Sequence, residues 1–190
     1  MERSRLKSVV ESLLFVSESA VTLDRMSAVL EGVEKKEILS VIEELRSEYE
    51  SQGRGILLFE VAGGFQMRTP KENADWVKNL LRGRAARMSR ATLETLSIVA
   101  YKQPVTRVEI EHVRGVSVDG VLSTLMERRL VRIVGRKDVL GRPFLYSTTR
   151  EFLELFSLKD LTGLPTLKEM EEVSLPQISE DEPLPVESEQ

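Results

Sequence analysis

The chain has 190 residues, 41% of them hydrophobic and 31% charged, which is enough for two small globular domains with separate cores. It has no cysteine and a single histidine, His112, which excludes disulfides, thiolate chemistry and a histidine-based metal cluster. The net charge of −4 combines −2 over residues 1–83, +5 over residues 84–163 and −7 over residues 164–190. Apolar runs fall far short of the ~20 residues that span a bilayer, so we expect a cytoplasmic protein without membrane contact.

The first 81 residues predict three helices followed by a β-hairpin. Apolar residues spaced by three and four positions predict helices over residues 6–14, 23–30 and 38–49. Thr22 is the expected N-cap of the second helix. Two short β-runs then flank a predicted turn at Gly63-Gly64. A final amphipathic helix follows Pro70, and we expect its Trp76 to pack against the domain.

The same order of elements recurs after residue 89. Three helical patterns lead into the hairpin LVRIVGRKDVLGRPFLY, residues 130–146, and Thr106 with Glu109 forms a T-x-x-E capping box. At an offset of 84 residues the apolar patterns of the two halves align, so that Val21-Thr22 falls on Val105-Thr106. This repeat predicts an α+β, mainly helical protein of two tandem winged-helix domains, each with three helices and a β-hairpin wing.

These patterns also predict the domain boundaries. The basic stretch RGRAARMS has no apolar period and is the expected linker, and four of the seven prolines with eight acidic residues lie beyond Gly163, which is typical of disorder. We therefore predict an N-terminal winged helix, a linker, a C-terminal winged helix and a disordered acidic tail, over residues 1–81, 82–89, 90–163 and 164–190.

No catalytic constellation is visible in the sequence. Phosphate-binding loops, nucleophile elbows and zinc-protease motifs are absent, and the adjacent carboxylates Glu43 and Glu44 point apart on a helix. His112 has no visible catalytic partners. We predict a non-enzymatic protein without cofactor or metal. An enzyme stays open only if a pocket brings distant carboxylates together.

A winged-helix transcriptional regulator that binds DNA is the alternative function. In such proteins the third helix usually reads the major groove and the wing contacts phosphate. Here the first third helix, residues 34–50, has six acidic and three basic side chains, which phosphate would repel. The second, residues 117–129, lacks Arg, Asn or Gln in its first turns. We therefore expect weak or absent direct DNA contact, through the basic wing at most.

Residues 90–165 closely resemble the segregation and condensation protein B family, ScpB. The segments AYKQPVTR and VGRKDVLGRPFLY, residues 100–107 and 134–146, are specific features of that family, and SLLFVSESAVTLDRM with VAGGFQMRT extends a looser likeness into the first half. The resemblance implies a non-enzymatic, nucleoid-associated subunit of the bacterial SMC complex that acts in chromosome condensation and segregation before cell division. It also implies a homodimer that binds the kleisin ScpA and, through it, the SMC ATPase.

Two groups of residues are the candidate contact sites. We expect the kleisin to bind the stiff turn between two helices and the basic wing tip, that is Tyr101, Lys102, Gln103, Pro104, Arg107, Arg136, Lys137 and Arg142. We expect the dimer to form through apolar residues of the first hairpin that a small domain leaves partly exposed, that is Leu57, Phe59, Phe65 and Met67. Taken singly, each residue of the first group is also compatible with a purely structural role.

Overall fold

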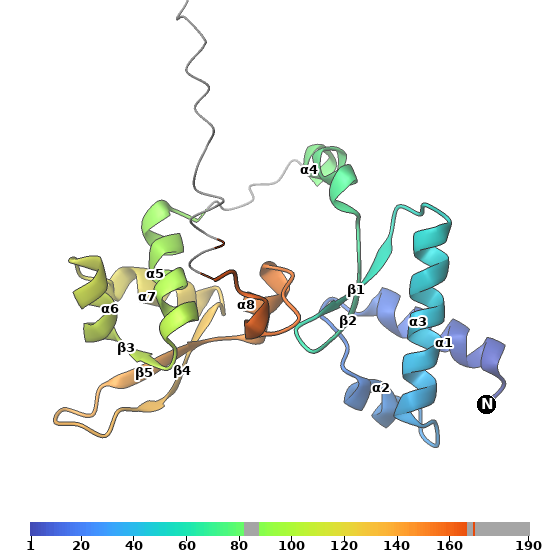
Figure 1. Cartoon of the computed structure of the whole chain (residues 1–190), viewed down its shortest axis with the longest axis horizontal. Coiled ribbons are helices and arrows are strands. Elements are labelled where there is room, and N and C mark those ends of the chain that lie inside the picture. Colours follow the sequence, from blue (N-terminus) through green and yellow to red (C-terminus); the bar gives the residue numbers. More distant parts are fainter. Residues whose placement is uncertain (82–87, 167–168, 170–190) are drawn as a thin grey trace, which may run out of the picture.

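The computed structural model describes residues 1–81, 88–166 and 169. The first unit contains α1 (Arg3–Val16), α2 (Leu23–Val29), α3 (Lys35–Ser51), β1 (Leu57–Val61), β2 (Gly64–Arg68), the 3-10 turn η1 (Lys71–Asn73) and α4 (Ala74–Leu81). The second contains α5 (Arg90–Lys102), β3 (Val105–Thr106), α6 (Arg107–Arg114), α7 (Asp119–Glu127), β4 (Val131–Arg136), β5 (Phe144–Thr148), α8 (Arg150–Leu155) and η2 (Leu161–Gly163). In each unit three helices precede a β-hairpin wing and a short fourth helix follows it, which confirms the predicted fold class (Figure 1).

The first core forms where one face of each helix meets the hairpin. The Thr22 side chain accepts a hydrogen bond from the Arg25 amide at 3.2 Å, and this cap starts α2 where the sequence predicts it. Because α1 and α3 both present apolar residues at helical spacing, their inward faces pack together. The fully buried members are Leu6, Val10, Leu14, Met26, Ile38, Val41, Ile42 and Leu45.

The turn of the first hairpin differs from the prediction by one residue. Ala62 and Gly63 occupy it, with φ of 51° and 66°, and Gly64 is already the first residue of β2. A Cβ on Gly64 would lie 2.7 Å from the carbonyl oxygen of Val21. That close approach exists because Val21 and Phe65 exchange main-chain hydrogen bonds of 2.8 and 2.9 Å. Gly64 is therefore required by the packing of the hairpin on the chain before α2, rather than by the turn.

The second domain repeats this plan with a larger sheet. Thr106 and Glu109 form the predicted capping box at the start of α6, and the sheet has the strand order β3-β5-β4. Val105 pairs with Tyr146 in β5, just as Val21 pairs with Phe65 in the first domain. The offset of 84 residues, seen in the sequence, therefore also relates corresponding elements of the two domains in the structure, up to the start of the third helix. It ends there because α3 has 17 residues and α7 has nine.

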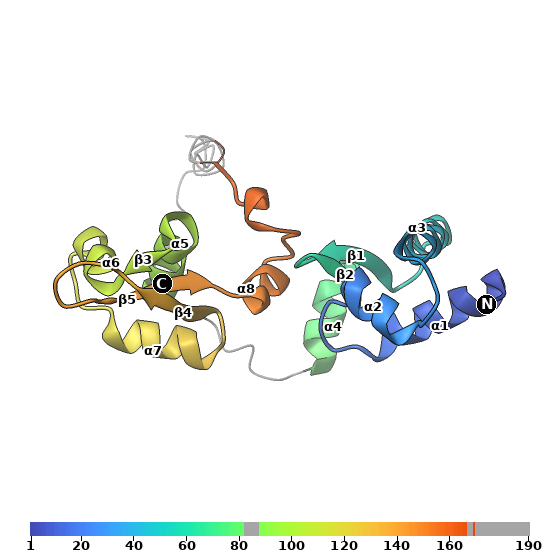
Figure 2. The same ribbon diagram turned by 90° about the horizontal axis from the view of Figure 1, so that it is seen from below.

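A turn of the second domain docks on the hairpin of the first, with α8 lying between the two units (Figures 1 and 2). The amides of Ala62 and Gly63 donate hydrogen bonds to the carbonyl oxygens of Leu158 and Lys159, at 2.8 and 2.9 Å. Leu153 packs against Val61, Ala62 and Ala20. The two winged helices therefore share a small apolar contact with main-chain hydrogen bonds at its edge.

Charged side chains complete this contact between the domains. Arg68 donates to the carbonyl oxygen of Glu154 at 2.8 Å and to the Ser157 hydroxyl at 2.7 Å. Arg150 donates to the Ala20 carbonyl oxygen at 2.6 Å, and the Glu154 carboxylate accepts from the Ala20 amide at 3.1 Å. The Arg150 and Glu154 side chains that bond to Ala20 also form an ion pair with each other along α8.

The described residues also bear on four other sequence expectations. Residues 82–87 of the expected linker lie outside them, while Met88 packs on the second core and Ser89 caps α5. Most of the expected tail also lies outside them, but Leu164 packs on the second core. The expectation for Trp76 is wrong, because its side chain is 73% exposed. No helix in the described ranges is long and apolar enough to cross a membrane.

Candidate partner-binding site

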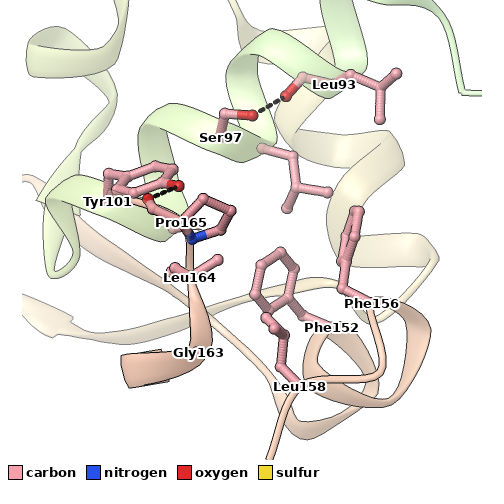
Figure 3. Close-up of a pocket in the computed structure, with 11 residues that line it drawn as sticks. Leu93, Ser97, Tyr101, Phe152, Phe156, Leu158, Gly163, Leu164 and Pro165 are labelled. Carbon is pink, nitrogen blue, oxygen red and sulfur yellow. Dashed lines mark hydrogen bonds between the residues drawn. The ribbon is translucent and has the colours of Figure 1, made fainter. Parts of the chain in front are cut away.

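An apolar groove opens in the second domain between α5 and the segment that follows β5 (Figure 3). It measures about 400 Å³. The buried Phe152 ring forms part of its wall, and the Phe156 ring lies 4.9 Å from it, centroid to centroid. Leu93 and Phe156 are 41% and 43% exposed. The full lining is Leu93, Leu96, Ser97, Ala100, Tyr101, Phe152, Phe156, Leu158, Gly163, Leu164 and Pro165.

Tyr101 holds one wall of this groove in place. Its hydroxyl donates a hydrogen bond of 2.6 Å to the carbonyl oxygen of Pro165, which Figure 3 shows as a dashed line. Leu164, next in the chain, packs on the second core. The wall is thus formed before any ligand arrives, and a preformed apolar groove with exposed aromatic and aliphatic side chains suits an apolar anchor of a peptide segment.

The remaining residues of the predicted turn face other surroundings. Lys102 and Pro104 line a second, more open hollow of about 540 Å³. Its other side is formed by residues of α6, among them Val108, His112 and Val113. Tyr101 does not line that hollow. The turn therefore separates two concave surfaces instead of forming one continuous contact site.

Gln103 is a structural residue of this turn. Its side-chain oxygen accepts hydrogen bonds from the Thr148 amide at 2.7 Å, from the Thr148 hydroxyl at 2.8 Å and from the Ser147 hydroxyl. Its side-chain nitrogen donates to the Ala100 carbonyl oxygen at 3.0 Å. Because every polar atom of this half-buried amide is used inside the domain, Gln103 ties the end of α5 to β5.

Arg107 is also engaged within the chain. Its guanidinium pairs with Asp119 at the start of α7 and lies 3.9 Å from Glu111. The hydrogen bond to Asp119, followed by the nearby negative charges, raises the pKa of Arg107 further. A partner would have to compete with Asp119 for this side chain.

The wing is fastened to α6 through Glu109. Lys137 forms an ion pair of 2.5 Å with the Glu109 carboxylate, which also accepts hydrogen bonds of 2.8 Å from the Thr106 amide and hydroxyl. The Lys137 hydrogen bond, followed by the two from Thr106, lowers the pKa of Glu109 to about 2. One carboxylate thus caps α6 and holds the wing.

The other two basic residues predicted to bind the partner, Arg136 and Arg142, are both exposed. The Arg136 guanidinium lies 4.1 Å from the centre of the Phe144 ring and donates to the Arg142 carbonyl oxygen at 3.1 Å. Arg142 is exposed, and Leu140 at the tip is fully exposed. The wing therefore presents positive charge beside an apolar tip.

The hairpin residues predicted to mediate dimerisation have different surroundings. Phe65 is 5% exposed and belongs to the first core, so its proposed role in an exposed apolar face is corrected. Met67 is half-buried against the same core, and Leu57 is also half-buried. Only Phe59, at 38%, counts as exposed. The reason is that this domain buries most of the hairpin within its own fold.

The third helices present acidic rather than basic surfaces. Along α3, Glu44 and Glu48 bind Lys7 and are therefore partly neutralised, but Glu34, Glu37 and Glu43 are exposed at its start and middle. Along α7 the exposed residues include Asp119 and Glu127. Within the described part of the chain, no group of three metal-ligating side chains is positioned to hold a metal ion.

The fold and site define a class of protein, a tandem winged-helix protein with a preformed apolar groove in its second domain. The family described as "Segregation and condensation complex subunit ScpB" matches residues 8–167. The chain belongs to this family.

Named relatives agree with that assignment. The segregation and condensation protein B of Syntrophotalea carbinolica is 48% identical over 174 residues, 92% of this chain and 88% of the relative. The one from Moorella thermoacetica is 49% identical over 165 residues, 87% and 84% of the two chains. A solved structure titled "Crystal structure of dimer of ScpB N-terminal domain complexed with ScpA peptide" is 40% identical with a TM-score of 0.38, covering 40% of this chain and 95% of that one.

Proposed function

We propose that this chain is a non-enzymatic accessory subunit of the SMC–kleisin complex and binds the kleisin ScpA as a homodimer. In this role it acts on the nucleoid in chromosome condensation and segregation before cell division. The sequence family supports the choice of process, because the relatives named above are segregation and condensation proteins. ScpA is the partner named for the solved N-terminal domain, and we extend that partner to this chain as part of the proposal.

The observation that carries the proposal is the groove between α5 and residues 152–165. Its lining is almost wholly apolar, and Leu93 and Phe156 leave apolar surface at its mouth. Apolar side chains that stay accessible on a folded domain commonly mark a protein contact. We assign to this groove an apolar anchor of the kleisin, and to the basic wing an acidic stretch of the same partner.

Direct DNA reading fits the surfaces less well. A recognition helix needs donors for base edges and cations for phosphate, whereas α7 exposes Asp119 and Glu127. Among the described elements the wing carries exposed basic side chains suited to phosphate, but the Lys137–Glu109 ion pair reduces its available charge. Protein binding is the function that uses the apolar groove and the wing together.

Replacement of Leu93 by Asp tests the groove. This substitution places a charge at the apolar mouth, and we expect it to weaken binding of purified ScpA about tenfold or more in calorimetric titration. Val116→Asp is the matched control, because Val116 is an exposed valine of the same domain that does not line the groove. Both variants must melt like the parent. Parental affinity in a folded Leu93→Asp variant would refute the assignment of the groove.

Replacement of Arg142 by Glu tests the wing separately. Arg142 is exposed, so the change should leave the melting temperature unchanged. We expect weaker ScpA binding at low salt and a smaller salt dependence, since exposed charge pairs are screened by salt. If ScpA binding by Arg142→Glu keeps the salt dependence of the parent, the wing does not contact ScpA and the contact is restricted to the groove.

A further inference from the structure

The chain leaves the second domain at the rim of the apolar groove. Leu164 and Pro165 line the groove, and the hydrogen bond of 2.6 Å from Tyr101 to the Pro165 carbonyl oxygen fixes this wall (Figure 3). Elsewhere in the lining, Leu93 and Phe156 keep 41% and 43% of their surface exposed. The residues that follow Pro165 therefore begin beside apolar surface that the described chain leaves uncovered.

A helix start follows directly after this wall. The Thr166 amide donates a hydrogen bond of 2.6 Å to the Glu169 carboxylate, and the Glu169 amide donates one of 3.3 Å to the Thr166 hydroxyl. This reciprocal pair is the capping box that begins many helices. In the sequence that follows, Leu167, Met170 and Val173 recur at every third position, which is the spacing of one helix face. The sequence after the cap therefore predicts a short amphipathic helix.

We infer that residues 167–174 cover the groove of their own chain in the absence of ScpA, with Leu167, Met170 and Val173 against its apolar lining. The inference rests on the proposed function, because it makes ScpA displace this segment in order to bind. The segment begins two residues beyond Pro165, so its effective concentration at the groove is of the order of millimolar. A contact too weak to hold a free peptide is therefore enough to hold this one.

Charge favours the same occupant. Residues 84–163 carry a net charge of +5 and residues 164–190 carry −7, so the domain attracts the segment that is tethered to it. The segment also combines apolar side chains with acidic ones, among them Glu171 and Glu172. An apolar anchor beside an acidic stretch is the chemistry that we assign to the kleisin. The tail thus offers in the same chain what ScpA offers from outside, and the two compete.

The reactivity of a thiol in the groove tests the cover without any partner. The chain has no cysteine, and the exposed Ser97 lines the groove, so Ser97→Cys introduces a single thiol there. We expect addition of Met170→Asp to accelerate its alkylation by a maleimide about fivefold, because the charged segment leaves the groove. Leu184→Asp, at an apolar residue near the chain end, is the matched control and should leave the rate unchanged.

A second thiol checks that the effect is local. Ser123→Cys places it on α7, at an exposed residue that does not line the groove, and its rate should not respond to Met170→Asp. Equal rates at position 97 with and without Met170→Asp would overturn the inference. Protection of that thiol that fades on dilution would assign the cover to a second molecule, which would also overturn it.

Calorimetric titration of ScpA onto the full chain tests the competition. We expect Met170→Asp to tighten ScpA binding about fivefold, because no segment has to be displaced, and Leu184→Asp to leave it unchanged. A faster thiol with parental ScpA affinity would overturn the competition and show that ScpA binds elsewhere. If no variant binds ScpA, the proposed function fails, and the thiol rates still decide whether the tail covers the groove.

Discussion

The guanidinium of Arg68 in β2 donates a hydrogen bond of 2.8 Å to the main-chain carbonyl oxygen of Glu154 in α8. The two residues belong to different winged helices, and the same guanidinium also reaches Ser157 at 2.7 Å. One side chain thus joins the wing of the first domain to the last helix of the second. The amides of Ala62 and Gly63 are hydrogen-bonded across the same boundary.

Replacement of Arg68 by Ala should loosen the contact between the domains without unfolding either core. The readout is hydrogen exchange of the Ala62 and Gly63 amides, which donate to Leu158 and Lys159. We expect their exchange to accelerate several-fold, because opening of the domain contact exposes both amides to water. Arg25→Ala, at an exposed arginine of the first domain, should leave the exchange unchanged. Unchanged protection in Arg68→Ala would contradict the role of this residue.

Replacement of Gly64 by Ala should destabilise the first domain. The added Cβ would lie 2.7 Å from the Val21 carbonyl oxygen, so the strand pairing must shift, at a cost of about 1–3 kcal/mol in the free energy of unfolding. Gly120→Ala is the control, because a Cβ there meets no atom within 4 Å and lies in a helix. The control should stabilise the protein by up to ~1 kcal/mol. Chemical denaturation measures both, and equal stability of the two variants would be incompatible with the packing described.

Replacement of Gln103 by Ala should destabilise the second domain rather than act on a partner surface. The change removes the acceptor of the buried Thr148 amide and should cost ~1–3 kcal/mol. Lys102→Ala, one residue earlier and exposed, should change stability by less than ~0.5 kcal/mol. Thermal denaturation distinguishes the two. If Gln103→Ala melts like the parent but loses ScpA, Gln103 contacts the partner directly.

Because of the Glu109 carboxylate, part of the free energy of unfolding should change with pH in the acidic range. Its pKa of about 2 in the folded chain lies below the ordinary unfolded value near ~4.3. The stabilisation by ionised Glu109 is therefore complete at a pH above its pKa in the unfolded chain. It is lost as the pH falls from there towards the folded-state pKa of about 2. The effect is small, because water screens a side chain that is 45% exposed.

Glu109→Gln isolates that contribution. Glutamine can still accept at the N-cap amide of Thr106, but it does not titrate and has no charge for Lys137. We expect the difference in unfolding free energy between parent and variant to shrink as the pH falls through this window. A difference that stays constant with pH would show that the pairing of Glu109 with Lys137 does not contribute to stability.

The elements that the sequence predicts correctly depend on local chemistry. Thr22 and Thr106 each start a helix because a side-chain oxygen caps amides three residues ahead, and such signals are complete within one turn. Two adjacent glycines leave the position of a tight turn ambiguous by one residue. Only the long-range contact of Gly64 with Val21 decides it.

The candidate site was only partly predictable for the same reason. Gln103 looks like an exposed turn residue, yet its hydrogen bonds reach residues more than forty positions away. The groove combines Leu93 with Phe156 and Leu164, which no local pattern brings together. Two local signals were available: Tyr101, which is a predicted contact residue and lines the groove, and the four-residue spacing of Phe152 and Phe156, which places both rings on one helix face.

The most direct measurement of the central claim is a titration of purified ScpA and of duplex DNA, in parallel, onto the full parent chain. We predict saturable ScpA binding at micromolar concentrations with a defined stoichiometry. We predict DNA binding that is absent or weak, without sequence preference, and lost as salt rises. No ScpA binding, together with tight DNA binding that depends on sequence, would contradict the account and identify the chain as a DNA-reading winged-helix protein.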